Sequence, residues 1–374
     1  MKITDVRVFE LVGRSRDGVA LYEIERGGLD PGEVSPYRQT FTEIITDEGV
    51  TGLCPGGSAA VKAFGQNLIG EDPTCYEAIW EKLTTRPHSA TRNLSALSIL
   101  DLALWDLLGK MRGESVCRLL GGPVRDRIRA YAGMLGFDTE PGNAAARSAE
   151  WVDKGFTALK WYLPNNEEAG KAGLRHNVEL VGAVRDEVGP DVDIMVDCIL
   201  SNSSRNSVLY AVELARQLEE FDLTWLEEPL NPDDFDAYEQ LGQNCSIPLA
   251  FGERLPTRRL FAQAIDRSLV SVLQPELFVI GGMTELRKLA VLTSTHSVPM
   301  IPHANESCRH AMHMLFTLPT RFSPLGEWGV KINHNVQYFY RGFYEPVDGY
   351  FTVPDGPGFG YEIDPDKIVS QKEL

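Results

Sequence analysis

The chain has 374 residues, of which 43% are hydrophobic and 24% are charged, and its formal net charge is −17. This much apolar material suits one large domain with a smaller one, and the moderate charge content excludes a mainly disordered protein. An acidic surface repels phosphate backbones and anionic lipid headgroups, so we expect neither nucleic acid nor a membrane as a partner. An acidic small-molecule substrate would need a local positive charge from Lys, Arg or a metal ion.

The sequence shows no apolar segment of signal-peptide or membrane-span length, which predicts a cytoplasmic protein. The cysteines are scattered and form no CxxC pair. We therefore expect buried thiols in a reducing compartment, and neither disulfides nor a zinc site. These residues are Cys54, Cys75, Cys117, Cys198, Cys245 and Cys308.

The first third of the chain mixes strand and helix patterns. Residues 1–10 alternate apolar and polar side chains, and residues 41–53 suggest two strands around a turn. The pattern then becomes helical, and residues 94–113 predict one long helix that ends in Lys, Arg and Gly. Residues 1–125 are therefore predicted to form an α+β capping domain.

From Arg125 onward, short β-rich runs alternate with helical segments. This alternation predicts a parallel sheet, and eight repeats predict a TIM-like (β/α)₈-type barrel over residues 126–330. Residues 331–374 are rich in Gly, Pro and aromatic side chains, and we expect them to return to the first domain. The β-runs lie at 128–133, 158–163, 193–197, 223–228, 248–253, 270–276, 298–303 and 323–328.

Nearly every β-run ends in an ionisable residue, where the mouth of a parallel barrel holds its active site. Asp197, Glu227 and Glu253 end three consecutive runs and should be neighbours there. Two carboxylates about 4 Å apart repel by roughly 4 kcal/mol at an effective dielectric of about 20, so three of them require a cation. Hard oxygen ligands with open positions favour Mg²⁺. The alternative is three separate acids at the edge of the core.

Lys160 and Tyr162 lie two residues apart on one run, so both side chains face the mouth. A tyrosine has a reference pKa near 10 and needs help to act as a base at neutral pH. A nearby ammonium or metal ion would favour the phenolate. Tyr162 is therefore a candidate base, with Lys160 as its activator and as a partner of a substrate carboxylate. The alternative is that Tyr162 packs in the barrel and Lys160 pairs with a carboxylate.

Glu276 and His303 end neighbouring runs across the barrel from Lys160 and Tyr162. A carboxylate on one imidazole nitrogen fixes the tautomer and raises the pKa of the histidine, which favours a general acid or base. A lone histidine is otherwise more often structural. Glu327 lies on the last run and could hydrogen-bond a substrate oxygen, or it could cap the strand end against Trp328.

These residues occur within motifs that together resemble the enolase superfamily, mandelate racemase subgroup, along the whole chain. The resemblance implies an α+β capping domain on a (β/α)₇β barrel, and homo-oligomers. It also implies Mg²⁺ bound by Asp197, Glu227 and Glu253. The motifs are LDLALWDLLGKMRGESVCRLLGG (100–122), MVD (195–197), WLEEP (225–229), GERL (252–255), QPELFVIGGMTELRKLA (274–290) and VPDGPGFG (353–360).

The resemblance also implies a shared first step. The metal ion and a lysine bind a substrate carboxylate, a base removes the α-proton, and an enediolate forms. The chain departs from the family pattern at three positions: Tyr162 replaces a second lysine, Glu276 replaces the usual Asp, and Ile199 replaces an Asn. Tyrosine on the second strand together with a histidine dyad resembles acid-sugar dehydratases. This implies Tyr162 as the base, His303 as the acid that helps expel the β-hydroxyl, and a 2-keto-3-deoxy acid product.

Other reactions remain open at this stage. A cycloisomerase or an epimerase or racemase of a carboxylate sugar would use the same parts. A retaining glycosidase would need two carboxylic acids about 5 Å apart and no metal, and a non-catalytic barrel would need none of these groups. In such a family substrate choice depends on capping loops at about 13–38 and 51–58 and on mouth residues. Candidate substrate contacts are Arg14, Arg16, Arg26, Arg38, Trp161, Asn305, Glu306 and Arg309.

Overall fold

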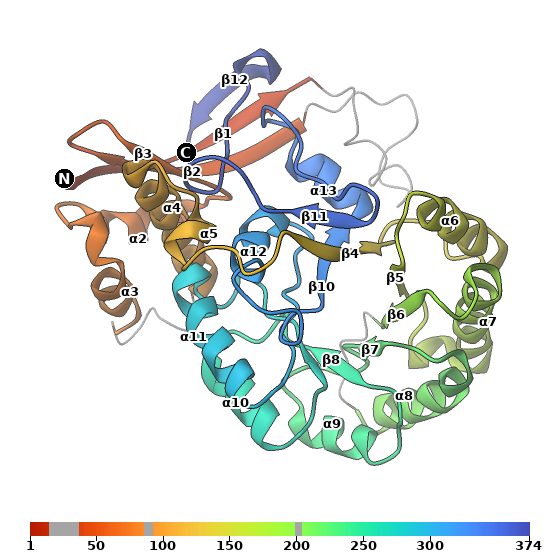
Figure 1. The fold of residues 1–374 in the computed structure, drawn as a ribbon. Coiled ribbons are helices and arrows are strands. Elements are labelled where there is room, and N and C mark those ends of the chain that lie inside the picture. Colours follow the sequence, from red (N-terminus) through yellow and green to blue (C-terminus); the bar gives the residue numbers. More distant parts are fainter. Residues whose placement is uncertain (15–36, 86–92, 199–203) are drawn as a thin grey trace.

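A computed structural model of the chain describes residues 1–14, 37–85, 93–198 and 204–374 (Figure 1). An antiparallel sheet with strand order β12-β1-β2-β3 contains strands from the N-terminal and C-terminal parts of the chain. Its buried positions recur along β1 because alternate side chains of a strand point to opposite faces. The strands are β1 (Ile3–Gly13), β2 (Tyr37–Thr46), β3 (Thr51–Pro55) and β12 (Ile368–Glu373).

The long predicted helix is present as α4 (Leu94–Arg112), and it ends at Gly113, whose φ of 66° suits glycine. Its buried residues extend from Ala96 to Gly109 because it packs against the sheet on one side and α11 on the other. Gly52 of β3 allows this approach, since a Cβ there would lie 2.1 Å from the carbonyl oxygen of Ala103. The neighbouring helices are α2 (Ala59–Gly65), α3 (Tyr76–Thr84) and α5 (Val116–Leu119).

A second sheet is parallel and curled, with strand order β10-β4-β5-β6-β7-β8-β9, and β11 (Tyr350–Thr352) pairs with β4 in the antiparallel sense. Helices follow most strands and lie outside the curl (Figure 1). This confirms the predicted parallel α/β sheet. The parallel strands are β4 (Arg127–Gly133), β5 (Ala158–Tyr162), β6 (Asp193–Asp197), β7 (Trp225–Glu227), β8 (Leu249–Phe251), β9 (Val272–Leu273) and β10 (Leu325–Gly329).

The remaining helices complete the element order. They are α6 (Pro141–Asp153), α7 (Gly170–Val188), α8 (Arg205–Leu218), α9 (Phe235–Gly242), α10 (Arg258–Asp266), α11 (Gly282–Thr295), α12 (Cys308–Leu315) and α13 (Val330–Val336). In the described parts of the chain, no helix is both long and apolar enough to cross a bilayer.

One predicted strand is not found as such. The run 298–303 forms only single parallel bridges, between Leu273 and Met300 and between Glu276 and His303. Pro299 and Pro302 lie in this run, and proline has no N–H to donate to a sheet. A second expectation also fails, because Cys75 is exposed and Cys245 is only partly buried, although all six thiols are free.

An apolar layer fills the inside of the curled sheet. It places the functional residues, because the side chain two positions further along a strand points the same way. The layer consists of Tyr131, Ala158, Met195, Trp225, Ala250, Ile301 and Leu325. Two positions beyond these residues, at the carboxyl ends, come Gly133, Lys160, Asp197, Glu227, Gly252, His303 and Glu327.

Candidate active site

Three predicted carboxylates lie at the ends of neighbouring strands. Asp197 and Glu227 are paired in register at the ends of β6 and β7. Glu253 follows β8 by two residues. Glu227 is only 2% exposed, and its Oε2 accepts hydrogen bonds from Trp225 Nε1 at 2.9 Å and from Gln274 Nε2 at 2.7 Å. The strand β7 therefore delivers a carboxylate that is already held in place by two neutral donors.

The Lys160 ammonium occupies the centre of this carboxylate group. Its Nζ lies 2.7 Å from Glu227 Oε1, 2.8 Å from Glu327 Oε1 and 3.9 Å from Asp197 Oδ2. Burial alone would lower the pKa of Lys160, but Glu227 and Glu327 outweigh it and raise that pKa well above the usual value. Lys160 is therefore a permanent cation here. It pairs with carboxylates, which was the alternative to a role as activator of Tyr162.

Glu327 is fully buried in β10 and remains ionised. Desolvation opposes this charge, but Lys160 and His303 lower the pKa of Glu327 to about 2. Its Oε2 also accepts the backbone N–H of Ala304 at 2.5 Å. Glu327 therefore links the lysine at the end of β5 with the segment that carries His303.

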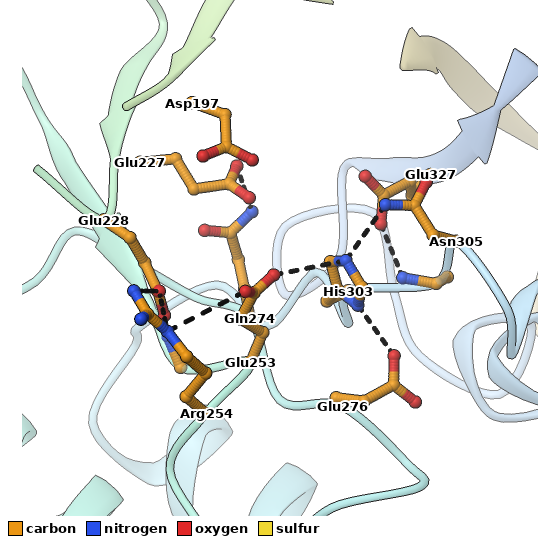
Figure 2. A network of polar contacts seen from close by, with 12 residues as sticks. Asp197, Glu227, Glu228, Glu253, Arg254, Gln274, Glu276, His303, Asn305 and Glu327 are labelled. Carbon is orange, nitrogen blue, oxygen red and sulfur yellow. Dashed lines mark hydrogen bonds and ion pairs between the residues drawn. The ribbon is translucent and has the colours of Figure 1, made fainter. Parts of the chain in front are cut away.

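His303 and Glu276 form the predicted dyad, with 2.7 Å between Nδ1 and Glu276 Oε2 (Figure 2). The other nitrogen, Nε2, lies 3.2 Å from Glu253 Oε2 and 3.0 Å from the Asn305 amide. Burial lowers the pKa of His303, but Glu327, Glu253 and Glu276 outweigh it and raise that pKa well above its usual value. His303 is accordingly an imidazolium that can give up a proton.

The charge on His303 decides how the Asn305 side chain is oriented. An imidazolium donates from both nitrogens, so Asn305 must offer its oxygen to Nε2. Among the described residues, the buried Asn305 Oδ1 has no hydrogen-bond partner as placed. Exchange of the amide oxygen and nitrogen brings an acceptor to His303 Nε2, and such an exchange is a matter of assignment.

Tyr162 ends β5 on the same side as Lys160 but makes a different contact. Its hydroxyl donates to the carbonyl oxygen of Phe137 at 2.7 Å, in the segment that follows β4. Its side chain is partly buried. The phenol is therefore the protonated partner in this arrangement, and a role as base requires that this proton first be lost.

A cavity of about 760 Å³ separates the dyad from the antiparallel sheet. Glu253, Glu276 and His303 line one side, together with Asn305 and Glu306. Tyr37 and Arg38 from β2 line the opposite side, with Gly56, Ser95 and Ile99. Arg38 also pairs with Glu10 at 2.8 Å. The cavity therefore brings charged groups from both sheets around a space large enough for a small acid.

The donor set fits a hard divalent cation in its chemistry, because three carboxylates supply the oxygen ligands that such ions take. Within the described ranges, no three His, Cys, Asp or Glu side chains are close enough to share one ion. Protein cations lie among the acids instead: Lys160 contacts Glu227 and His303 contacts Glu253. A bound ion would compete with these two side chains for the carboxylate oxygens.

Comparisons with known proteins identify the family of the chain. Residues 143–367 match the family described as "Enolase C-terminal domain-like", and residues 32–121 match "Mandelate racemase / muconate lactonizing enzyme, N-terminal domain". The chain belongs to the mandelate racemase/muconate lactonizing enzyme family of the enolase superfamily. The resemblance inferred from the motifs is thereby confirmed.

Individual relatives within this superfamily are similar over nearly their whole length. The chain is 33% identical to D-galactarolactone cycloisomerase of Agrobacterium fabrum, over 88% of this chain and 90% of that protein. It is 31% identical to L-rhamnonate dehydratase of Saccharopolyspora erythraea, over 98% and 97%. The structure of 3,6-anhydro-D-galactonate cycloisomerase from Zobellia galactanivorans matches with a TM-score of 0.78, 28% identity and 98% coverage of both chains.

Some predicted substrate contacts lie elsewhere in this superfamily member. Trp161 is buried under α6, where its Nε1 donates to Ser148 Oγ at 2.9 Å, because it alternates with the inward Lys160 and Tyr162. Arg309 packs against the rings of Tyr344 and Tyr361 instead of lining the cavity. The carbonyl oxygen of Arg14 accepts a hydrogen bond from the Tyr338 hydroxyl. Arg16, Arg26 and Ile199 lie outside the described residues.

Sequence reasoning missed the groups that hold the acids in place. Glu228 pairs with Arg254 through a bond of 2.6 Å and accepts the N–H of Gly252 at 3.3 Å. Glu228 also has a φ of 40°, which is uncommon for a side chain of this kind. Gln274 could have been found, since it lies two positions before Glu276 and shares its side of the strand.

Proposed function

We propose that this protein is a Mg²⁺-dependent acid-sugar dehydratase on a (β/α)₇β barrel with an α+β capping domain. One observation supports the reaction more than any other: a His303–Glu276 dyad lines a cavity that Glu253 also lines, and His303 lies against Glu253. The names of the relatives, an acid-sugar dehydratase and two sugar cycloisomerases, support the same class of substrate.

The first role belongs to the carboxylates and the lysine. Asp197, Glu227 and Glu253 are the proposed metal ligands, and bound Mg²⁺ would supply Lewis-acid stabilisation of the charge that develops on the substrate carboxylate. Lys160 contributes a second positive charge at the same place. Because Trp225 and Gln274 hold Glu227 in position, the site changes little when charge develops, which is the condition for electrostatic catalysis.

Two proton transfers complete the proposed reaction. Tyr162, as phenolate, takes the proton α to the carboxylate, and the electron pair of the C–H bond passes into the carboxylate to give an enediolate. His303 then donates its Nε2 proton to the β-hydroxyl, the C–O bond breaks and water leaves. The resulting enol gains a proton at carbon and loses its hydroxyl proton, and it becomes a 2-keto-3-deoxy acid. Glu276 holds the imidazole through Nδ1, so that Nε2 faces the cavity side.

The alternative is a cycloisomerase or an epimerase of a carboxylate sugar. The cycloisomerase names among the relatives favour it. It would share the first proton abstraction and differ in the fate of the enediolate. The glycosidase and the non-catalytic barrel do not account for a histidine dyad beside three strand-end acids.

The deciding assay incubates the protein with Mg²⁺ and a panel of monoacid and diacid sugars, and measures 2-keto acid formation with an EDTA control. Keto acid that disappears with EDTA supports the dehydratase. Deuterium incorporation at the α-carbon in D₂O without keto acid would transfer the assignment to an isomerase.

The role of Tyr162 is tested by the Tyr162→Phe variant, which should lower turnover by at least 10²-fold if the phenol is the base. Tyr350→Phe serves as the matched control, because Tyr350 packs on Arg127 away from the cavity. Full turnover by Tyr162→Phe would leave His303 to perform both proton transfers.

A further inference from the structure

One carboxylate in the cavity beyond the dyad has no part in the proposed reaction. Glu306 lies three residues after His303 and lines the same cavity of about 760 Å³. Its side chain is exposed, and it makes no hydrogen bond or ion pair with any other residue that the structure describes. Glu306 is therefore available to a molecule that enters the cavity.

The groups that its charge reaches place Glu306 between the dyad and the antiparallel sheet. The surrounding protein raises the pKa of Glu306, Glu276 raises it further, and the His303 imidazolium lowers it. On the opposite side of the cavity, burial and then the Glu306 charge raise the pKa of Tyr37 above its usual value. Tyr37 therefore keeps its hydroxyl proton, and it shares this part of the cavity with the Glu306 carboxylate.

The reacting end of the substrate decides which part of it reaches Glu306. In the proposed reaction the α-carbon and the β-carbon lie beside Tyr162 and His303, so the remaining carbons extend past the dyad towards the antiparallel sheet. Strand β2 and helix α4 bound the cavity there. They contribute the hydroxyl groups of Tyr37, Thr40 and Ser95 and, among the described residues, one charged side chain, that of Arg38. Such hydroxyl groups donate to and accept from the hydroxyls of a sugar chain.

The arginines of the cavity already have carboxylate partners. Arg38 lies 2.8 Å from Glu10 of β1. Arg254, which lines the cavity as well, donates to Glu228 at 2.6 Å. A second carboxylate on the substrate would therefore meet the unpaired negative charge of Glu306, whereas a hydroxyl could donate a charge-assisted hydrogen bond to it.

We propose that Glu306 is a specificity-determining residue that selects sugar acids with a single carboxylate. It accepts a hydrogen bond from a hydroxyl at the far end of the substrate, and it repels a second carboxylate at that end. The proposal rests on the proposed function, because the dyad and the acids beside it fix which end of the substrate faces Glu306. Discrimination of this kind combines an attraction for one ligand with a repulsion of its competitor.

The test compares sugar acids that differ only in their terminal group, at pH 8 in the presence of Mg²⁺. The pairs are D-gluconate with D-glucarate, D-galactonate with galactarate, and D-mannonate with D-mannarate, and in each pair a second carboxylate replaces a hydroxymethyl group. Affinity is measured from the ligand-dependent rise in Tm, and kcat/KM is compared for the acids that react. The best monoacid should bind at least about tenfold more tightly than its diacid.

Two substitutions at Glu306 separate its charge from its size. Glu306→Gln keeps the length and an acceptor oxygen, so monoacid binding should change little while the diacid becomes nearly as good a ligand. Glu306→Lys should reverse the preference. Glu362→Gln is the matched control and should leave the preference unchanged, because Glu362 is exposed and pairs with Arg341 at 3.3 Å.

The wild-type comparison does not depend on how the variants fold. Diacids that bind as tightly as monoacids overturn the proposal. A preference for diacids that is lost in Arg38→Met also overturns it and assigns the far end of the substrate to Arg38.

The two proposals can fail separately. A monoacid that binds selectively without forming a keto acid removes the dehydratase and leaves Glu306 as the selecting residue. Keto acid formed from both classes with equal kcat/KM supports the dehydratase and removes this role of Glu306. If no acid of either class binds, both proposals fail.

Discussion

Replacement of Lys160 by methionine tests the electrostatic centre of the site. The side chain is 5% exposed and its ammonium lies within 3 Å of Glu227 and Glu327, which are 2% and 0% exposed. Lys160→Met keeps most of the apolar volume and removes the charge. Both acids would then be buried without the cation that they now share.

The magnitude follows from the pKa of Glu327. Its native pKa is lowered from 4.5 to about 2, and a lowering of this size corresponds to about 3 kcal/mol of stability. Loss of one partner from a buried ion pair costs about 3–5 kcal/mol in general. For a carboxyl whose pKa is lowered, the contribution is present above its unfolded pKa and lost as the pH falls towards 2. The variant should therefore be destabilised at pH 7 by about 3 kcal/mol or more, which for a chain of 374 residues is roughly 4 °C in Tm.

Thermal unfolding in EDTA and in Mg²⁺ provides the assay. Lys288→Met is the matched control, because Lys288 lies 2.8 Å from Glu77 on the surface and such a pair is worth less than about 1 kcal/mol. Mg²⁺ should raise the Tm of Lys160→Met more than that of the wild type, since the ammonium no longer competes for Glu227. If Lys160→Met has the same Tm as Lys288→Met, the stabilising role of the buried charges around Lys160 is refuted. Equal effects of Mg²⁺ on both proteins would argue against Glu227 as a ligand.

Two further predictions concern a second step of the reaction and a buried acid. His303→Asn should lower keto acid formation by at least 10²-fold while α-carbon exchange in D₂O persists. His296→Asn is the control, because His296 is exposed, and it should change neither rate. If His303→Asn loses exchange together with dehydration, separate roles for Tyr162 and His303 are contradicted. Burial raises the pKa of Asp101 to about 7, so the native state loses stability as the pH rises from about 4 to 7. Asp101→Asn should consequently be more stable than the wild type by about 2 kcal/mol at pH 8 but not at pH 5, as measured by urea unfolding; an equal difference at both pH values would refute this.

The spacing of the ionisable residues along the sequence identified which side chains lie together at the strand ends, because strand periodicity and the order of parallel strands are local properties. Asp197 and Glu227 are in register, and Glu276 meets His303 across one bridge. The partner of each charge could not be predicted in the same way. Lys160 turns towards Glu227 and Glu327 and not to Tyr162, because those two acids approach it from β7 and β10, a relation set by the curl of the sheet.

Other differences have equally specific causes. Trp161 was expected at the mouth near the substrate, yet the alternation along β5 that turns Lys160 and Tyr162 inward turns Trp161 outward to Ser148. Pro299 and Pro302 explain why an apolar run failed to form a full strand.

The antiparallel sheet has a consequence for how the protein is made. Strand β12 pairs with β1, and the N–H of Leu374 donates to the carbonyl oxygen of Val8 at 2.9 Å. Translation proceeds at about 5–20 residues per second, so the outer edge of β1 waits roughly 20 to 70 s for its partner. Most of β12 is exposed, so it contributes backbone hydrogen bonds more than apolar burial. A nascent chain in which β12 has not yet been made therefore presents an open strand edge, where a fused tag or a neighbouring nascent chain could pair in its place.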